Sequence, residues 1–302
     1  TRITTSLIEK SIAYETTEGG LPLTVEGRLE AGTYALQGDV SSQFFSGLLM
    51  TLPLLDGDSR LRSTTPLESA SYVDMTIDCL RQHGVVIDKE WDGSYRIAGN
   101  QSYRPGTYTV EGDYSQAAFW LSAGTLGRAV CCTGLRQHSS QGDEVIVSLI
   151  RDMGGQIEGK TELTACPSDL VGRVIDVQDC PDLVPVLTVL ASCAKGITRI
   201  VHAGRVRLKE CDRLHAMATE LNKIGGDVEE EAEGLIIHGV DGFTGGTVSG
   251  WNDHRIAMAL AVASQRCRQP LRIEGAECVR KSYPDFWKDF ETLGGMIEKE
   301  EG

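Results

Sequence analysis

Residues 224–228 read Ile-Gly-Gly-Asp-Val, and this stretch decides the fold because similar stretches recur along the chain. The corresponding glycines are Gly84, Gly154, Gly225 and Gly294, so the steps between neighbours are 70, 71 and 69 residues. A glycine at this place ends a helix by turning the chain left-handed before a strand begins. The constant interval predicts an array of repeats.

A second pattern has nearly the same period. It combines a short strand, an acidic turn and a helix that opens with polar residues. Its acidic residues are Asp39, Asp113, Asp182 and Asp253, which are 74, 69 and 71 residues apart. A helix start carries unpaired N–H groups and the positive end of the helix dipole. Repeated helix starts that face one centre would therefore provide several seats for anions.

The spacing of apolar residues assigns helices and strands to these repeats. Helical spacing is present at Phe44, Leu48 and Leu49, and again at Leu214, Met217 and Leu221. Residues 198–201 and 234–237 are typical of strands. The expected fold class is therefore mixed α and β.

The turn-forming residues 103–107 (Tyr-Arg-Pro-Gly-Thr) predict a domain boundary, because a new copy of the acidic marker follows them. A length of 302 residues also favours two domains. We expect residues 1–108 to form a partial N-terminal domain with one full repeat and the tail of another. Residues 7–12 supply that tail because they echo 149–154. Residues 109–302 should then form a C-terminal domain of three repeats.

The composition is that of an ordinary globular chain, with 41% hydrophobic and 24% charged residues. No apolar run approaches the ~20 residues that cross a bilayer, and residues 1–6 do not begin a secretory signal. The cysteines number nine, an odd count without a CxxC pair or zinc spacing. We expect reduced thiols, with Cys131 and Cys132 in packing roles, a cytoplasmic location, and neither a metal nor an organic cofactor.

Basic residues gather at three places even though the formal net charge is -14. Residues 205–213 (RVRLKECDR) hold four cations around one Glu and one Asp, and NDHR (252–255) and RKSYP (280–284) follow downstream. Arg grips an oxyanion with two parallel hydrogen bonds, while Lys acts as a point charge or a proton carrier. If the fold brings these places together, they would bind a phosphate or a carboxylate. The acidic remainder argues against nucleic acid as a partner.

Each place also has a structural interpretation. A Lys-Glu-x-Asp-Arg run at a helix start is often a solvated face with capping carboxylates. Ser41-Ser42 and Asp253 could be ordinary N-caps, Asp182 could belong to a first helical turn, and Lys281 could lie in a simple turn. Their coincidence at equivalent positions of the repeat favours a shared binding role.

Six motifs together resemble the family of 5-enolpyruvylshikimate-3-phosphate (EPSP) synthase, the 3-phosphoshikimate 1-carboxyvinyltransferase of the shikimate pathway of aromatic amino-acid biosynthesis. They follow the family order across nearly the whole chain: GDVSSQF (38–44), LESASYVD (67–74), PD (181–182), LKECDRL (208–214), NDHR (252–255) and KSYPDF (281–286). The resemblance implies a two-domain, inverse-barrel-like array of repeated β-α-β-α-β-β units. The first domain would be incomplete, and the active site would lie in the cleft between the domains.

The resemblance also implies a role for each motif residue. Shikimate 3-phosphate would be bound by Ser41, Ser42, Ser69, Tyr72, Asp182, Arg205 and Lys209. Phosphoenolpyruvate would be bound by Gln43, Arg213, His254, Arg255 and Lys281. The catalytic residues would be Asp182, Lys209 and Glu210. The implied reaction transfers the enolpyruvyl group to the 5-hydroxyl of shikimate 3-phosphate and releases phosphate, which requires a base and an acid.

The resemblance leaves alternatives open. The family's N-terminal segment, with a Lys-Ser pair, an Asn-Ala-Gly-Thr loop and two further Arg, has no counterpart here, so activity of this chain alone is in question. One alternative is a noncatalytic fragment that binds shikimate 3-phosphate and needs a complementing segment. Another is a UDP-N-acetylglucosamine enolpyruvyl transferase, a family without the LKECDR and NDHR combination. We expect small-molecule substrates, no membrane partner, and a monomer unless a complementing N-terminal fragment exists.

Overall fold

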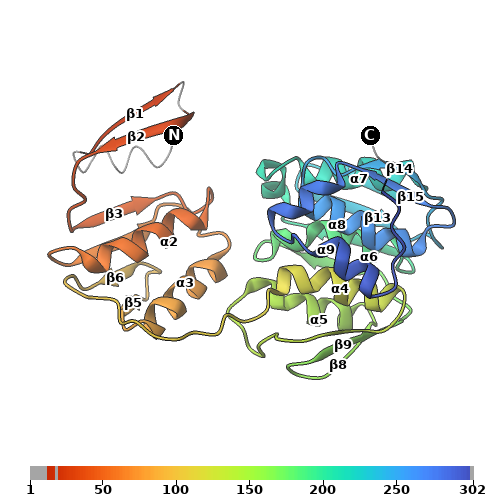
Figure 1. Ribbon diagram of the computed structural model, residues 1–302. Coiled ribbons are helices and arrows are strands. Elements are labelled where there is room, and N and C mark those ends of the chain that lie inside the picture. Colours follow the sequence, from red (N-terminus) through yellow and green to blue (C-terminus); the bar gives the residue numbers. More distant parts are fainter. Residues whose placement is uncertain (1–11, 18–19, 300–302) are drawn as a thin grey trace. The chain divides into compact units, whose positions relative to one another are not determined.

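The computed structural model describes residues 12–17 and 20–299 and divides into two compact units (Figure 1). The N-terminal unit comprises the described residues up to Thr109 together with Ser140–Gly142. The C-terminal unit comprises Val110–Ser139 and the described residues from Asp143 onward. Each has its own hydrophobic core. The predictions on residues 1–6 and 7–11 lie outside the described residues, and the assignment of whole repeats to two domains stays a prediction.

The N-terminal unit contains a hairpin and a four-stranded sheet of order β3-β4-β6-β5. In the sheet β3 and β4 are parallel, while β6 is antiparallel to both β4 and β5. Its strands are β1 (Ala13–Thr17), β2 (Gly20–Glu26), β3 (Thr33–Leu36), β4 (Ser59–Ser63), β5 (Ile87–Lys89) and β6 (Tyr95–Ile97). Its helices are α2 (Ser42–Thr51), η1 (Leu52–Leu54) and α3 (Ala70–Gln82).

The C-terminal unit contains the same strand order again, as β10-β11-β13-β12. A three-stranded sheet, β7-β9-β8, and a parallel pair, β14-β15, each reproduce part of that order. These strands are β7 (Val130–Cys132), β8 (Gln156–Glu158), β9 (Leu163–Cys166), β10 (Val174–Asp176), β11 (Ile197–Val201), β12 (Asp227–Glu231), β13 (Gly234–His238), β14 (Gly246–Ser249) and β15 (Leu271–Glu274). The recurring order makes this a repeated α/β architecture and confirms the predicted fold class.

Three inner helices form the core of the C-terminal unit. All ten residues of α8 and all nine of α6 are buried, as is nearly all of α4, because these helices are apolar on every side. The helices are α4 (Tyr114–Leu126), α5 (Ile146–Asp152), α6 (Val184–Ser192), α7 (Arg213–Lys223), α8 (His254–Ala263) and α9 (Phe286–Thr292). Short 3-10 turns are η2 (Gly142–Val145), η3 (Pro181–Leu183), η4 (Gly204–Leu208), η5 (Ser264–Arg266) and η6 (Ala276–Lys281).

The repeated glycines end helices as predicted. Gly84, Gly154, Gly225 and Gly294 have φ values of 83°, 97°, 88° and 96°, which lie in the left-handed region. At each site the following N–H bonds back to the carbonyl five residues earlier, for example Gly226 N to Leu221 O at 2.8 Å. This is the bond of a Schellman motif. The sequence repeat therefore corresponds to one repeated helix end.

A helix also follows each acidic marker, but the capping residue differs. Asp113 and Asp253 cap α4 and α8 with their own side chains. In contrast, Ser41 caps α2, and the Asp39 carboxylate instead accepts a bond from Thr65 Oγ1 at 3.0 Å. Asp182 lies inside the first turn of η3. The four helix starts thus correspond in position, whereas the four aspartates have different roles.

The predicted strands are confirmed by β11 and β13, and Leu214, Met217 and Leu221 are buried on α7. The helix predicted from Phe44, Leu48 and Leu49 is confirmed by α2. Phe45 and Leu49 are fully buried, while Phe44 and Leu48 are only partly buried. Because adjacent positions are both apolar in this helix, the pattern does not decide which of them turns inward.

The nine cysteines are free. Cys132 packs against the core, but Cys131 is exposed, so the packing role predicted for the pair is wrong for Cys131. The pleat of β7 explains the difference, because neighbouring strand residues face opposite sides. Across the described ranges, no helix is long and apolar enough to cross a membrane.

Candidate active site

Arg213 lies at the centre of a charged cluster in the C-terminal unit. It is the first residue of α7, and its side chain is only 1% exposed. Its Nε donates to Asp253 Oδ2, its Nη1 to Asp182 Oδ1 and its Nη2 to Glu210 Oε2, each at 2.8 Å. One guanidinium therefore holds together three carboxylates from three separate segments of the chain.

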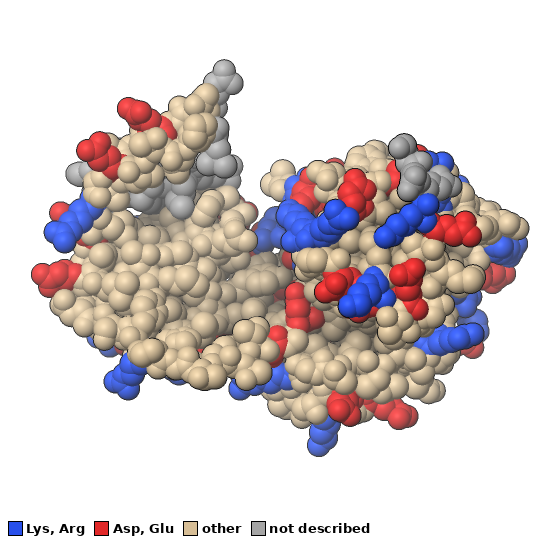
Figure 2. Space-filling model, viewed as in Figure 1, with Lys and Arg blue, Asp and Glu red and all other residues tan. Residues whose placement is uncertain are grey.

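Three further cations surround the same carboxylates. Arg255 Nη2 lies 3.1 Å from Asp182 Oδ2, and Lys209 Nζ lies 3.3 Å from Asp182 Oδ1. Lys281 Nζ donates to Glu210 Oε1, although its side chain is 57% exposed. With Arg213, the cluster has four cations against three carboxylates. On the face of the C-terminal unit that Figure 2 shows, acidic and basic side chains are interspersed.

Helix starts explain why these side chains meet. Asp253 caps α8 by accepting from Arg255 N at 2.9 Å, and its carboxylate also binds Arg213 at the start of α7. From α8, Arg255 Nη2 reaches Ser115 Oγ at the start of α4, at 3.1 Å. The positive ends of α4, α7 and α8 therefore lie near one another, which favours an anion beside them.

Two polar atoms of the cluster are buried without a hydrogen-bond partner in the described part of the chain: Arg255 Nη1 and His254 Nδ1. The nearest acid to His254 Nδ1 is Asp253 Oδ1, at 3.8 Å. A buried guanidinium N–H without a partner is costly. An oxyanion beside Arg255 would satisfy it.

The cluster shifts the ionisation of its own carboxylates. Burial alone would raise the pKa of Asp182, but Arg255, Lys209 and Arg213 together hold that pKa well below its usual range. Burial likewise opposes ionisation of Glu210, but the hydrogen bond from Lys281 and the charge of Arg213 lower its pKa to about 2. Both acids are therefore ionised at neutral pH.

His254 shows the opposite electrostatic balance. Burial lowers its pKa, and the charge of Arg255 lowers it further, against a weaker opposing effect of Asp253. The imidazole is accordingly neutral at pH 7, so it offers one donor and one acceptor nitrogen and no added charge.

The residues expected around shikimate 3-phosphate in the N-terminal unit lie at two helix starts. Ser41 Oγ accepts from Gln43 N at the start of α2, and Ser42 is buried beside it. Ser69 directly precedes α3, has a φ of 52° and is fully buried. Tyr72 N donates to Ser69 O at 3.1 Å.

These two helix starts lie side by side because their leading loops touch. Glu68 N donates to Gly38 O at 3.1 Å. A Cβ on Gly38 would lie 2.6 Å from Pro66 O and 2.7 Å from Leu67 Cα, so glycine is required there for steric reasons. Further along, Ser46 Oγ and Thr76 Oγ1 join α2 to α3 at 2.7 Å. The expected meeting of this set with the Arg213 cluster stays a prediction.

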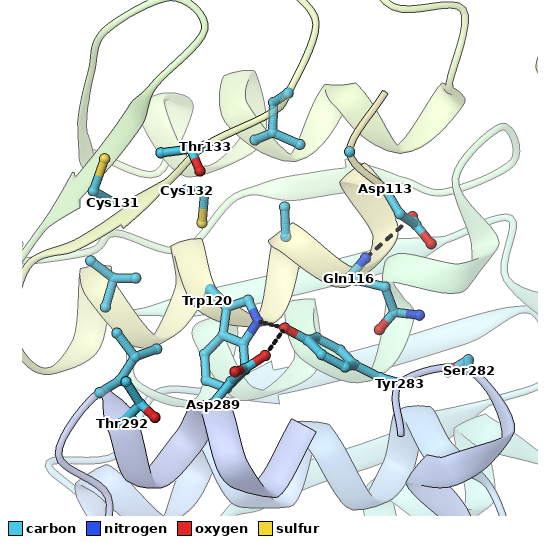
Figure 3. Close-up of a pocket in the computed structure, with 15 residues that line it drawn as sticks. Asp113, Gln116, Trp120, Cys131, Cys132, Thr133, Ser282, Tyr283, Asp289 and Thr292 are labelled. Carbon is cyan, nitrogen blue, oxygen red and sulfur yellow. Dashed lines mark hydrogen bonds between the residues drawn. The ribbon is translucent and has the colours of Figure 1, made fainter. Parts of the chain in front are cut away.

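A pocket of about 610 Å³ adjoins the loop that follows Lys281 (Figure 3). Tyr283 OH accepts from Trp120 Nε1 at 3.2 Å and donates to Asp289 Oδ2 at 2.7 Å, which anchors the loop to α4 and α9. The lining includes Asp113 and Asp289 but no Lys or Arg. It therefore does not suit an anionic substrate, and its contacts instead hold the loop that carries Lys281.

Comparison with known proteins shows the family of the chain. The sequence pattern of the family described as EPSP synthase (3-phosphoshikimate 1-carboxyvinyltransferase) matches residues 6–290. The chain belongs to the EPSP synthase family. It is 54% identical over 291 residues to the 3-phosphoshikimate 1-carboxyvinyltransferase of Clostridium kluyveri, covering 96% of this chain and 68% of that relative. The enzyme of the same name from Clostridium acetobutylicum is 52% identical over 292 residues, with the same shares covered.

Two solved structures share the fold. EPSP synthase from Acinetobacter baumannii is similar with a TM-score of 0.82 and 26% identity, covering 98% of this chain and 71% of that chain. The enolpyruvyl transferase NikO from Streptomyces tendae has a TM-score of 0.77 at 20% identity, with 98% and 71% covered. The second likeness concerns the fold alone.

Within this EPSP synthase fold, the structure brings together most of the predicted residues of the C-terminal unit. Arg207, one of the four cations of residues 205–213 but not a predicted site residue, binds Asp212 and Glu230 at 2.8 and 2.6 Å. These ion pairs support a structural role for Arg207. Arg205 lies in η4, and its proposed place near shikimate stays a prediction.

Two residues of the cluster were missed as site residues. Asp253 binds Arg213 with both oxygens, at 2.8 and 3.3 Å, and Ser115 binds Arg255. Asp253 is one of the repeated acidic residues, and Ser115 lies two positions after another, Asp113, so the repeat itself was the available signal. The repeat suggested a helix cap at Asp253 but not a second bond to a distant arginine.

Proposed function

We propose that the Arg213 cluster binds phosphoenolpyruvate and that the starts of α2 and α3 bind the phosphate of shikimate 3-phosphate. The EPSP synthase family transfers the enolpyruvyl group of phosphoenolpyruvate to the 5-hydroxyl of shikimate 3-phosphate and releases phosphate. One observation carries the proposal: in a chain of net charge -14, four cations from three segments converge on the two carboxylates of Asp182 and Glu210.

The cations have distinct tasks in this proposal. Every nitrogen of the Arg213 guanidinium already donates to a carboxylate, so Arg213 positions the other groups. Arg255 has a buried Nη1 to offer, and Lys281 is the most exposed cation of the cluster. These two therefore contact the carboxylate and phosphate of phosphoenolpyruvate, with Lys209 completing the charge.

Binding exchanges partners within the cluster. The incoming anion competes with Glu210 for Lys281 and with Asp182 for Arg255 and Lys209. As each carboxylate loses a cation, its pKa rises toward the ordinary value of about 4. The substrate thereby converts two tightly paired anions into groups that accept and return a proton.

The proton transfers follow from that exchange. Addition forms a bond from the 5-hydroxyl oxygen to C2 of phosphoenolpyruvate. The ionised Asp182 takes the hydroxyl proton, and Lys209 stays beside it as the cation. Glu210, which takes up a proton from solvent as its pKa rises, delivers that proton to C3. Elimination then breaks the bond from C2 to the phosphate oxygen, Glu210 removes a proton from C3, and Asp182 returns its proton to the leaving phosphate. A positioned acid and base of this kind contribute about 10² to 10⁴ in rate.

The N-terminal unit supplies the second anion site in this proposal. Ser41 and Ser42 stand at the first turn of α2, where N–H groups and the helix dipole favour phosphate. Ser69 Oγ is buried and has no hydrogen-bond partner in the described part of the chain, so it also has a donor to offer. Tyr72 completes the set, whereas Gln43 at the same start of α2 is proposed to contact phosphoenolpyruvate.

Two measurements test the proposal. Calorimetry with shikimate 3-phosphate reports whether the chain binds this substrate. Phosphate release from phosphoenolpyruvate and shikimate 3-phosphate is then followed with and without a polypeptide that matches the part of the Clostridium kluyveri relative outside the alignment. Release under either condition supports the enzyme. Binding without release under both conditions supports the noncatalytic alternative, and absence of binding overturns the proposal.

The finer predictions on partners and location belong to the same proposal. The family match favours shikimate 3-phosphate over a UDP amino sugar. We further propose a monomer in the cytoplasm; the nine free cysteines support a reducing compartment. Light scattering of the purified chain measures the oligomeric state, and localisation of a tagged chain measures the compartment.

A further inference from the structure

Glu220 is a carboxylate that the proposed chemistry does not use, yet it is completely buried. It lies on α7, seven residues after Arg213, and its side chain is 0% exposed. Its Oε1 accepts from Trp251 Nε1 at 2.6 Å, and its Oε2 accepts from Ser249 N at 3.0 Å. Lys223 Nζ completes the set at 2.8 Å. A buried charge is tolerated only with such partners.

The segment that Glu220 holds is a strained turn. Trp251 and Asn252 have φ values of 52° and 51°, so two consecutive residues with side chains occupy the left-handed region. That conformation is disfavoured for L-residues and persists only where the surroundings enforce it. Trp251 N donates to Ser249 Oγ at 3.1 Å, and Asp253 N donates to Gly250 O at 2.8 Å. The turn therefore ends directly at Asp253.

Helix α7 holds this turn at two points. Residues seven apart lie on the same helix face, roughly 10 Å along the axis. Arg213 binds the Asp253 carboxylate at the end of the turn, and Glu220 binds Trp251 and Ser249 at its beginning. The Trp251 ring also packs edge-on against His215, with centroids 5.6 Å apart.

We propose that Glu220 is a positioning residue of the active site. Through Trp251 Nε1 and Ser249 N it fixes the left-handed turn, and so it sets the direction of Asp253 and of Arg255 at the start of α8. Its effect on catalysis rests on the function proposed above. Its effect on the geometry of the Arg213–Asp253 pair does not.

The test uses substitutions of graded severity. Trp251→Phe keeps an aromatic ring but removes the donor to Glu220, and Glu220→Gln leaves one carbonyl acceptor for three donor groups. Two controls bracket them. Lys223→Ala removes the exposed partner of Glu220 without touching the turn, and Leu221→Val creates a small defect in the core at the adjacent position.

The first measurement is the NMR signal of the Arg213 Nε–H group, which donates to Asp253. We expect Trp251→Phe and Glu220→Gln to shift or broaden this signal in the folded chain, and both controls to leave it in place. An unchanged signal in both turn variants overturns the proposal whatever the enzyme assay gives. The NMR result therefore stands apart from the test of the proposed function.

The second measurement is steady-state phosphate release under the conditions that support turnover. For Trp251→Phe we expect the KM for phosphoenolpyruvate to rise about tenfold, the size of one buried hydrogen bond, with the KM for shikimate 3-phosphate unchanged. Leu221→Val should lower the unfolding temperature without raising the KM for phosphoenolpyruvate alone. Equal changes in both KM values, tracking the loss of stability as in Leu221→Val, would mean that Glu220 is only structural.

Discussion

Arg213 and Arg255 are near neighbours in space but have different chemistry. Arg213 has all three nitrogens bound to carboxylates and is buried, so its contribution is to hold Asp182, Glu210 and Asp253 in place. Arg255 has a buried Nη1 that no described residue satisfies. An incoming oxyanion can therefore bind Arg255 without dismantling the framework that Arg213 provides.

This difference leads to a prediction for Arg255→Ala. We expect the KM for phosphoenolpyruvate to rise about 10- to 100-fold, because a charge-assisted hydrogen bond contributes about 1.5–3 kcal/mol. The KM for shikimate 3-phosphate should change little. Steady-state phosphate release with each substrate varied in turn measures both values. Arg199→Ala is the matched control, since Arg199 forms an exposed ion pair with Glu231. Unchanged kinetics in Arg255→Ala would remove it from the anion site.

The same partner exchange predicts the effect of Lys281→Ala. This substitution removes the exposed cation that pairs with Glu210. We expect weaker use of phosphoenolpyruvate, again visible as a raised KM in the phosphate-release assay, because a desolvated anion loses a charge partner. Lys288→Ala, on the adjoining α9, is the control. Identical KM values for the two variants would contradict the role of Lys281.

Glu210→Gln separates proton transfer from binding. The amide still accepts a hydrogen bond but cannot deliver a proton, so we expect kcat to fall by about 10² or more while phosphoenolpyruvate binding is largely kept. Single-turnover phosphate release measures the chemical step, and calorimetry measures the binding. Glu231→Gln, at the exposed pair with Arg199, serves as the control. A defect confined to binding would make Glu210 a structural residue.

At the scale of secondary structure, the helix end is the unit that repeats. Gly84, Gly154, Gly225 and Gly294 occupy equivalent left-handed positions, and each is followed by the same back-bond to the helix. The helix starts are less uniform, since serine caps α2 and aspartate caps α4, α7 and α8. The left-handed conformation at the helix end favours glycine strongly, whereas several residue types can cap a helix start.

Two glycine substitutions test this point. Gly225→Ala places a side chain at a φ of 88°, although the new Cβ meets only ordinary contact at 3.4 Å, so the cost is conformational. We expect the free energy of unfolding to fall by about 1–2 kcal/mol. Gly47→Ala, inside α2 with nothing within 4 Å, should be neutral or should stabilise by about 0.5–1 kcal/mol. Urea unfolding of both variants measures the difference; equal effects would contradict the argument.

At the scale of the molecule, an acidic chain concentrates cations at one place, and the cost of burying them is met by carboxylates from distant segments. Asp182, Glu210 and Asp253 lie far apart in sequence, yet one guanidinium contacts all three. The stability of the C-terminal unit should therefore depend on the ionisation of this cluster.

The depressed pKa values set the pH window. The pKa of Glu210 is about 2 in the folded chain, and that of Asp182 is also lowered, against about 4 in the unfolded chain. The two ionised carboxylates therefore contribute fully to the free energy of unfolding above pH ~4. This contribution is lost as the pH falls toward their pKa values in the folded chain. Between pH 5 and pH 3, the unfolding temperature should fall less for Glu210→Gln than for the unaltered chain. Parallel pH curves would contradict this assignment.

Local sequence patterns were sufficient for the repeat, for the strands at β11 and β13 and for the buried face of α7, because each depends on neighbouring residues only. They also singled out Asp182, Glu210, Arg213, Arg255 and Lys281, which lie together in the C-terminal unit. The patterns failed at Cys131, because its neighbour Cys132 is a residue of the same type that faces the other side of the strand.

Tertiary packing assigned the partners. No spacing in the chain indicates that Asp253 both caps α8 and accepts hydrogen bonds from Arg213. The spacing is equally silent on the hydrogen bond from the Trp251 indole to Glu220. It also does not indicate that Arg255 reaches Ser115 on another helix. Helix caps and turns involve residues a few positions apart, so they can be read along the chain. Contacts such as Arg255–Ser115 span 140 positions, and they form only where the packing of α4, α7 and α8 brings those helix starts together.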